Sequence, residues 1–316
     1  MTLFTEQVPN EYAGMRLDRV LAELFPSFSR SKLKTWIKAG RVAVDGKSLQ
    51  PKDRLEGGES IKLDAEAEPV LECAAEAIAL AIVHEDEQLL IVNKPAGLVV
   101  HPAAGNWQGT LQNALLYHDP GLAALPRAGI VHRIDKETSG LLMVAKTLPA
   151  HFHLVEQLQA RNIDREYIAL CNGRMTAGGN IDLPIGRHPT DRKRFAVRES
   201  GKTAITHYRV MERFAQHTLI QVKLETGRTH QIRVHMAHIR YPLTGDPVYG
   251  GRFKLPPDCP QMLATTLREF KRQALHAAKL GLLHPGSGAY CSWEIAPPED
   301  MLQLLEMLRE NERAVH

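Results

Sequence analysis

The stretch from residue 129 to residue 147 places a compact polar group directly before a buried strand. It reads Gly-Ile-Val-His-Arg-Ile-Asp-Lys-Glu-Thr-Ser-Gly-Leu-Leu-Met-Val-Ala-Lys-Thr. The apolar run 141–145 is typical of a strand buried on both faces, so the polar group must lie at the edge of a sheet. Within that group, Asp135 has Arg133 and Lys136 as neighbours, and both cations favour its ionised form. A carboxylate held beside a rigid strand can act as a nucleophile, a general base or a metal ligand.

The bulk properties are those of an ordinary soluble chain of two domains. Its 316 residues are 44% hydrophobic and 24% charged, and no apolar run is long enough to cross a membrane. The first residues lack the basic-then-apolar pattern of a signal peptide, so we expect a cytoplasmic protein. The 4 cysteines are scattered without a CxxC pair, which predicts free thiols. A net charge of +3 is too small to predict nucleic-acid binding by itself, so its distribution matters more.

Basic residues gather between Arg30 and Arg54, where 8 Lys or Arg stand against 2 acids. Apolar spacing predicts helices over 15–24 and 30–39, the second capped by Ser29, followed by a hairpin with an Asp-Gly turn. Two helices and a hairpin with one basic face are typical of a small RNA-binding module, although a solvated helix face has the same composition. The side chains expected to contact RNA are Arg30, Lys32, Lys34, Lys38 and Arg41.

An acidic segment separates this region from the rest of the chain. Residues 64–76 contain 5 acids and no basic residue, which predicts a linker. We therefore expect a first domain over 14–75, including the linker, and a second over 76–316. Because predicted strands outnumber helices in the second domain and many adjoin in sequence, we expect an α+β fold with a mixed, largely antiparallel central sheet.

The polar residues argue against several kinds of chemistry. His230, His235 and His238 lie close together but lack the spacing and carboxylates of a metal site, so we expect the first two to make hydrogen bonds that hold a turn. Ser139 is not in a GxSxG motif, and no phosphate-binding loop is present, which disfavours a serine hydrolase and an ATP-driven reaction. Glu137 is poorly placed as the second acid of a glycosidase pair.

What remains is a lone carboxylate with arginines and a tyrosine. Such a set suits a reaction in which the carboxylate acts covalently, or as a base, at a base–sugar junction. Arg228, on a glycine turn after a strand, is a candidate partner for Asp135 because a bidentate guanidinium fixes the orientation of a carboxylate. Tyr167 offers a flat ring for a nucleobase and a hydroxyl for proton transfer. Taken alone, Tyr167 is also consistent with an aromatic residue of the core, and Arg228 is also consistent with a charged residue of the surface.

Two sets of motifs resemble known families. Leu17-Asp18-Arg19, Ser29-Arg30-Ser31 and Val44-Asp45-Gly46 resemble the S4 RNA-binding module over residues 14–63. Motifs spread over residues 80–298 resemble the RluA family of pseudouridine synthases, and they appear in the family's order. These motifs are Asn93-Lys94-Pro95-Ala96-Gly97, His132-Arg133-Ile134-Asp135-Lys136-Glu137-Thr138-Ser139-Gly140, Arg165-Glu166-Tyr167, Gly227-Arg228-Thr229-His230-Gln231-Ile232-Arg233-Val234-His235 and Gly245-Asp246-Pro247-Val248-Tyr249-Gly250.

The resemblance implies the pseudouridine synthase fold and an isomerase that needs no cofactor and no metal. In that reaction the N1–C1′ bond of uridine breaks, the uracil turns, and C5 rejoins C1′. The resemblance implies that Asp135 is catalytic, that Tyr167 stacks on the target base and takes part in removing the C5 proton, and that Arg228 pairs with Asp135. It also implies that Ile232 packs on the base and that Arg133 fills the gap left by a flipped uridine.

The closest motif pattern within the family belongs to members that modify large-subunit ribosomal RNA. It is carried by Val100-His101-Pro102, Arg187-His188-Pro189-Thr190 and Arg272-Gln273-Ala274-Leu275-His276-Ala277. We therefore expect 23S ribosomal RNA as the partner and the helix 69 stem-loop as the target, for a monomer with no membrane association. The competing functions are a ribosome-assembly factor that binds RNA without catalysis, and a hydrolase or N-glycosidase that releases uracil.

Overall fold

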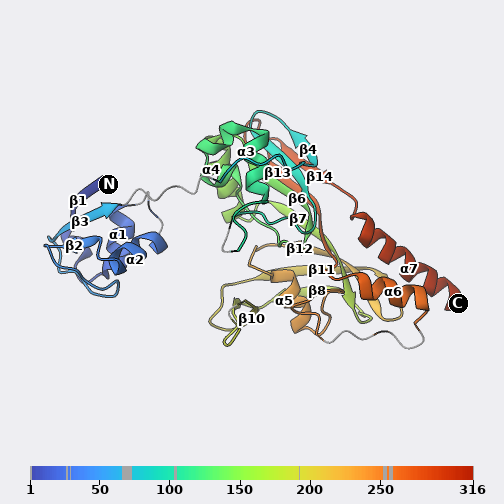
Figure 1. Cartoon of the computed structure of the whole chain (residues 1–316). Helices are drawn as coiled ribbons and strands as arrows, with labels where there is room; N and C mark the ends of the chain where they lie inside the picture. Colours follow the sequence, from blue (N-terminus) through green and yellow to red (C-terminus); the bar gives the residue numbers. More distant parts are fainter. Residues whose placement is uncertain are drawn as a thin grey trace. The chain divides into compact units, whose positions relative to one another are not determined.

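The computed structural model describes residues 2–25, 28, 30–65, 73–102, 105–191, 193–251, 255 and 259–315. The chain divides into two units, Met1–Glu72 and Cys73–His316 (Figure 1). The division falls inside the acidic segment expected to be a linker. Most of that segment, and the expected helix cap Ser29, lie outside the described residues.

In the first unit two helices accompany a three-stranded antiparallel sheet. The elements are β1 (Thr2–Gln7), α1 (Leu17–Leu24), α2 (Arg30–Lys38), β2 (Val42–Val44) and β3 (Ser60–Ala65), with strand order β1-β3-β2. Leu17 and Leu21 lie one helical turn apart and are fully buried with Leu33 and Ile61. The two expected helices and the hairpin are present. The compact unit extends beyond the expected start at residue 14, because β1 precedes that residue and pairs with the distant strand β3.

One nine-stranded sheet forms the frame of the second unit. Its order is β4 (Ile82–Glu85), β5 (Leu89–Lys94), β6 (Ser139–Ala145), β13 (Leu275–Leu283), β7 (Asp164–Asn172), β12 (His217–Leu224), β11 (Ile205–Arg213) and β8 (Gly179–Asp182), with β14 (Tyr290–Glu294) paired to β13. The β6–β13 pair is parallel and the other pairs of this sheet are antiparallel. The expected α+β fold with a mixed, largely antiparallel sheet is confirmed.

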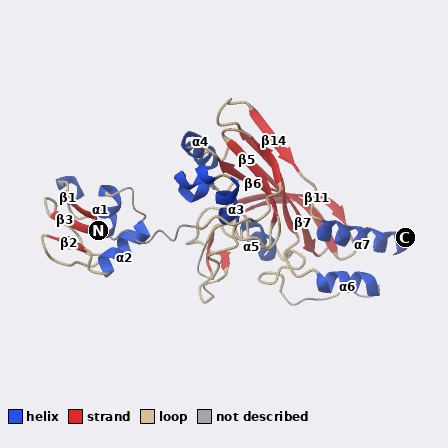
Figure 2. Ribbon diagram, turned by 45° about the horizontal axis from the view of Figure 1, so that its top comes forward, coloured by secondary structure: helices blue, strands red, loops and turns tan. Residues whose placement is uncertain are grey.

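Helices cover both faces of this sheet. They are α3 (Leu111–His118), α4 (Leu148–Gln159), α5 (Gln231–His238), α6 (Gln261–Glu269) and α7 (Glu299–Val315). In Figure 2, α3 and α4 lie toward one end of the sheet and α6 and α7 toward the other. A separate two-stranded ribbon, β9 (Ile185–Arg187) with β10 (Phe195–Val197), packs beside α5. Within the described residues, no helix is long and apolar enough to span a membrane.

Alternate residues of the central strands enter different cores, as the two-residue period of a strand requires. In β5, Leu90 and Val92 join the core that contains residues of α3 and α5, whereas Leu89 and Ile91 join the core that contains residues of α4. The strand β6 is buried along its whole length for the same reason. The catalytic candidate Asp135 therefore precedes one of the most rigid strands of the sheet.

Gly140 allows the close approach of β6 and β13. It pairs with Ala277 in the parallel ladder, and its φ of +115° is a conformation that favours glycine. A Cβ atom at this position would lie 2.3 Å from the carbonyl oxygen of Ala277. Both the backbone conformation and the space therefore exclude a larger residue.

We expect Gly140→Ala to lower the free energy of unfolding by about 3 kcal/mol or more, because backbone atoms must move apart. Gly288→Ala is the matched control, since Gly288 also has a positive φ of +70° but a methyl group added there would meet only open space. We expect Gly288→Ala to lower the free energy of unfolding by about 1 kcal/mol. Urea unfolding of both variants checks the difference, and equal losses would contradict the steric explanation.

Candidate active site

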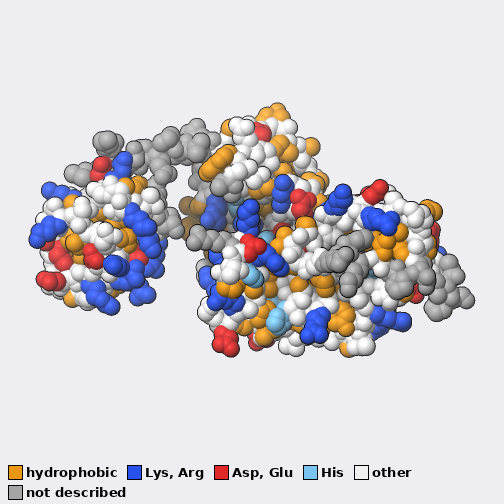
Figure 3. All heavy atoms as spheres, turned by 60° about the horizontal axis from the view of Figure 1, so that its bottom comes forward, with side chains coloured by type: hydrophobic (Ala, Val, Ile, Leu, Met, Phe, Trp, Pro, Cys, Tyr) orange, Lys and Arg blue, Asp and Glu red, His pale blue; other side chains and the backbone are white. Residues whose placement is uncertain are grey.

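A cleft of about 650 Å³ opens in the second unit beside Asp135. Segments that are distant in sequence line it, namely residues 131–135, the start of β7, and residues 224–233. Six arginines line it: Arg127, Arg133, Arg161, Arg165, Arg228 and Arg233. Figure 3 shows Lys and Arg side chains gathered on the face of the second unit in view. A cleft of this size and charge suits part of a polyanion.

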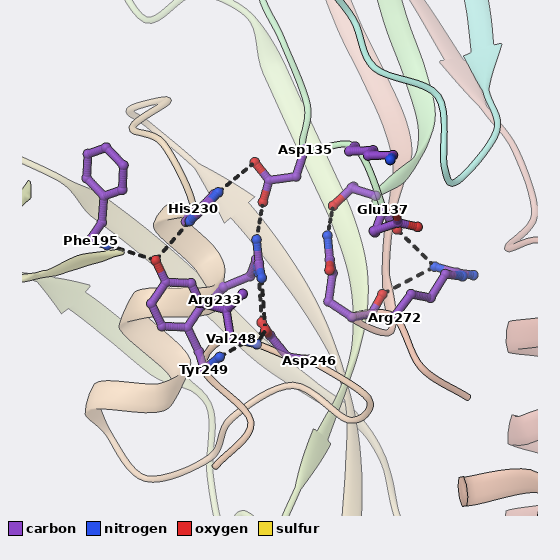
Figure 4. Close-up of polar contacts among 12 residues, drawn as sticks. Asp135, Glu137, Phe195, His230, Arg233, Asp246, Val248, Tyr249 and Arg272 are labelled. Atoms are coloured by element: carbon purple, nitrogen blue, oxygen red, sulfur yellow. Dashed lines mark hydrogen bonds and ion pairs between the residues drawn. The ribbon is translucent and has the colours of Figure 1, made fainter. Parts of the chain in front are cut away.

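Asp135 is held on one side by Arg233. The Nη1 atom of Arg233 donates to Oδ2 of Asp135 at 3.0 Å, whereas Oδ1 faces Nε2 of His230 at 3.9 Å (Figure 4). The other carboxylate that lines the cleft, Glu225, is paired with His207 at 2.6 Å and with Arg161 at 3.2 Å. Oδ1 of Asp135 is thus the carboxylate oxygen most available to a bound molecule.

A second carboxylate fixes the position of Arg233. Asp246 accepts from Nε of Arg233 at 2.7 Å and from Nη2 at 2.9 Å, a bidentate pair in which both residues are buried. The backbone amides of Val248 and Tyr249 also donate to Asp246. Burial alone would raise the pKa of Asp246, but Arg233 and these amides lower it below its usual value. The guanidinium therefore bridges the carboxylates of Asp246 and Asp135.

The expected pairing of Arg228 with Asp135 is wrong, because the structure assigns that position to Arg233. Arg228 is exposed on the turn before α5, and its Nε donates to the carbonyl oxygen of Thr203 at 2.9 Å. Arg233 lies inside α5 with its side chain buried. Both arginines belong to the same short motif, and α5 is buried from Gln231 to Met236, so helical periodicity does not show which one turns inward. Arg228 still lines the cleft.

Two apolar side chains form the floor next to Asp135. Tyr167, in β7, is 7% exposed, and Ile232, in α5, is 4% exposed, and both line the cleft. Burial raises the pKa of Tyr167, Arg165 opposes this rise, and Asp135 adds to it. The phenol therefore keeps its proton at pH 7. The structure brings Asp135, Tyr167 and Ile232 together, as the motifs predicted.

The turn that carries Asp135 is held by backbone atoms and side chains from other segments. Its own closure is a hydrogen bond from the Thr138 amide to the Asp135 carbonyl at 3.0 Å. The buried Lys94 donates to the carbonyl of Lys136 at 2.9 Å, and also to those of Pro95 and Leu98. These bonds explain why the Asn-Lys-Pro-Ala-Gly segment accompanies the catalytic motif.

A second support comes from the start of β13. Arg272 donates to the Glu137 carbonyl at 3.4 Å, and Gln273 donates to Oγ1 of Thr138 at 3.0 Å. His276 lies 2.9 Å from Oγ of Ser139. Sequence reasoning placed these residues in a family motif but gave them no role. The sequence does carry a signal for such internal contacts, because polar residues stand together directly before a buried strand and must find partners there.

The histidines of the motifs make structural hydrogen bonds, as expected. His235 is fully buried and bonds to Thr206 at 2.9 Å and to the Leu183 carbonyl at 2.9 Å. His132 accepts the amide of Met143 at 3.1 Å, and His230 bonds to the Tyr249 hydroxyl at 2.8 Å. Among the described residues, no group of three or more His, Cys, Asp or Glu is placed to hold a metal ion.

The RNA-contact candidates fall in both units. Arg133 is exposed at the rim of the cleft. In the first unit, Lys34 and Lys38 are exposed on α2, and Arg30 pairs with the buried Asp18 at 3.4 Å. Arg41 is half-buried and lies 3.9 Å from Asp64, and the Lys32 side chain lies outside the described part of the structure.

Comparison with known proteins assigns the family. The family model described as RNA pseudouridylate synthase matches residues 88–238, and the S4 domain model matches residues 15–61. Two human proteins, RNA Pseudouridylate Synthase Domain Containing 4 and 1, share the fold with TM-scores of 0.57 and 0.53 at 23% identity. These alignments cover 72% and 74% of this chain and 93% and 96% of the human chains.

Curated relatives match almost the whole chain. It is 58% identical to Ribosomal large subunit pseudouridine synthase D of Pseudomonas aeruginosa, over 98% of this chain and 96% of the relative. The protein of the same name from Escherichia coli K12 is 54% identical over 96% of this chain and 94% of the relative. The chain therefore belongs to the RNA pseudouridylate synthase family. The expected RNA pseudouridine synthase with an S4 domain is confirmed.

Buried histidines near the site predict that stability falls in acid. Burial lowers the pKa of His132 to about 3, with Arg165 adding to the effect, and lowers that of His276 to about 4. The unfolded chain binds these protons at about pH 6.5. Because the folded protein takes them up less readily, its free energy of unfolding should decrease as the pH falls from about 6.5 to about 4.

Urea unfolding at pH 7.5, 6.0 and 5.0 checks this prediction. The His276→Gln variant is the comparison, and we expect its stability to depend less steeply on pH than that of the unchanged protein. Stability that increased between pH 6.5 and pH 5 would contradict the prediction.

Proposed function

We propose that this protein converts uridine to pseudouridine in 23S ribosomal RNA of the large subunit, with Asp135 as its catalytic residue. The observation that carries the proposal is one carboxylate oxygen, Oδ1 of Asp135, left open in a cationic cleft beside Tyr167 and Ile232. Near full-length similarity to relatives named for the ribosomal large subunit supports the substrate class.

The cleft suits a single nucleotide taken out of its stack. A uridine within a helix cannot reach a carboxylate in such a cleft, so the base must leave the RNA, at a cost of a few kcal/mol. Tyr167 then stacks on the uracil and Ile232 packs against it. These contacts offset part of the free energy needed to move the base out of the RNA. Arg133, exposed at the rim, occupies the space that the uridine leaves.

Asp135 acts at the junction of the base and the sugar. The N1–C1′ bond of uridine breaks and a C5–C1′ bond forms. C5 loses one proton and N1 gains one, either the same proton or one from solvent, so that the reaction balances without a cofactor. Arg233 fixes the orientation of Asp135 through the bond at 3.0 Å. Arg228, at the rim, contacts the RNA backbone instead of the carboxylate.

The basic side chains of both units contact phosphates. In the S4 domain these are Arg30, Lys32, Lys34, Lys38 and Arg41. Binding should therefore weaken steeply with salt. We place the target in the helix 69 stem-loop, as the family resemblance implies, and unpaired loop uridines also cost less to flip.

We expect Asp135→Asn to lose at least about 1,000-fold in the rate of pseudouridine formation, because a neutral amide keeps the shape but not the charge. Its affinity for RNA should stay within about threefold. Glu225→Gln is the matched control, since this second carboxylate of the cleft is already paired, and its rate should remain within about tenfold of the unchanged protein. Tritium release from 5-³H-uridine RNA and filter binding provide the two measurements.

Each other outcome points to a different function. An Asp135→Asn protein that still forms pseudouridine at the normal rate would reject Asp135 as the catalytic residue. Release of free uracil by the unchanged protein would indicate an N-glycosidase. RNA binding with no product from the unchanged protein would favour the assembly factor.

Mapping of pseudouridines in 23S RNA tests the target. Cells that lack this protein should lose pseudouridines in the helix 69 stem-loop, and a plasmid copy should restore them whereas the Asp135→Asn copy should not. Helix 69 sites that persist in the deleted strain, together with losses at other uridines, would show that the expected target is wrong.

A further inference from the structure

Tyr249 links the backbone of β10 to the ring of His230. The Phe195 amide donates to the Tyr249 hydroxyl oxygen at 2.9 Å, and that hydroxyl lies 2.8 Å from Nδ1 of His230 (Figure 4). The hydroxyl has its own proton to donate as well as a second lone pair. Donation of that proton to Nδ1 gives the imidazole tautomer that carries its proton on Nε2.

The Nε2 atom of His230 faces the open oxygen of Asp135. It lies 3.9 Å from Oδ1, the oxygen that Arg233 does not hold. This distance is longer than a hydrogen bond, so the contact must shorten when a nucleotide binds. His230 has a φ of +58°, a left-handed conformation that costs a non-glycine residue roughly 1 kcal/mol or more. The ring is fixed there by edge-to-face contacts with Phe195 and Tyr249, at centroid distances of 5.7 Å and 5.6 Å.

Burial lowers the pKa of His230, which keeps its ring neutral at neutral pH. Asp135 and Asp246 oppose this effect, and Arg233 and Arg133 add to it. The groups packed on Tyr249 are cations as well. The guanidinium carbons of Arg233 and Arg194 lie over its ring, 5.0 Å and 5.4 Å from the ring centre. The donor from Tyr249 favours the neutral ring as well, because a protonated Nδ1 could not accept it.

We propose that His230 is a positioning residue for the reaction, and that Tyr249 sets its tautomer so that Nε2–H orients Oδ1 of Asp135 toward the nucleotide. A neutral N–H orients the oxygen without adding a second positive charge, which would make the carboxylate less reactive. Protonation of His230 in acid adds that charge, so activity decreases as His230 titrates. This inference rests on the proposed role of Asp135.

Tyr249→Phe tests the inference by removing one hydroxyl. We expect kcat at pH 7.5 to fall about 10-fold, the effect of losing one hydrogen bond of about 1.4 kcal/mol, with little change in KM. Loss of the donor to Nδ1 raises the pKa of His230, so the acid limb of the kcat profile should move to higher pH. Tyr290→Phe is the matched control, because the Tyr290 hydroxyl also makes a hydrogen bond, to Asp164 at 2.9 Å, but lies outside the residues that line the cleft.

A measurement on the free protein separates positioning from folding. The ¹⁵N shifts of the His230 ring should show the Nε2–H tautomer in the unchanged protein and in Tyr290→Phe, and a mixture of tautomers in Tyr249→Phe. The His230→Gln variant keeps a neutral N–H donor without a titrating ring. We expect it to retain at least a tenth of kcat and to lose the acid limb between pH 5 and pH 7.

The two proposals fail in different ways. An unchanged tautomer and pH profile in Tyr249→Phe, or an acid limb that persists in His230→Gln, would overturn the positioning role while Asp135→Asn remained inactive. Full activity of Asp135→Asn would instead overturn the proposed function, whatever tautomer the His230 ring adopts.

Discussion

The active site depends on one guanidinium shared by two carboxylates. Arg233 is 4% exposed, and a buried charge of this kind is stable only when its donors are satisfied. Asp246 accepts the hydrogen bonds of Nε and Nη2 of Arg233, which leaves Nη1 to hold Asp135. Because the amides of Val248 and Tyr249 hold Asp246 in turn, the loop after residue 245 acts on Asp135 through Arg233. Asp135 is thereby held with one oxygen occupied and the other open.

The remainder of the fold keeps that arrangement rigid. The turn with Asp135 precedes β6, a strand buried along its whole length, and receives hydrogen bonds from Lys94, Arg272 and Gln273. These donors come from segments that flank the turn on either side in the sequence, so the turn is held from two directions. Positioning by side chains that are themselves buried is what a site needs when one carboxylate must meet one bond of a flipped nucleotide.

Much of the site followed from residue types and motifs. Asp135, Tyr167 and Ile232 were predicted together, and they line one cleft. The choice between Arg228 and Arg233 was not predictable from spacing, because both lie in one motif and α5 is buried on several sides. The roles of Asp246 and Tyr249 depend on contacts made across the fold, with Arg233 and with the Phe195 amide respectively. Such pairings carry no local signal, since propensity and periodicity describe only neighbours along the chain.

The sequence by itself determined the order of the two units, the type of the second domain and the carboxylate at its centre. Periodicity and apolar runs indicate where helices and strands lie, because each must bury its apolar side somewhere. The motifs and their resemblance to a known family indicate the type of the second domain and its carboxylate. Only the tertiary structure decided that β13 lies between β6 and β7, which arginine meets Asp135, and which ring nitrogen of His230 faces it. These results depend on where a buried polar group finds its partner. That partner is selected by the whole fold, because every buried donor and acceptor must be satisfied at once.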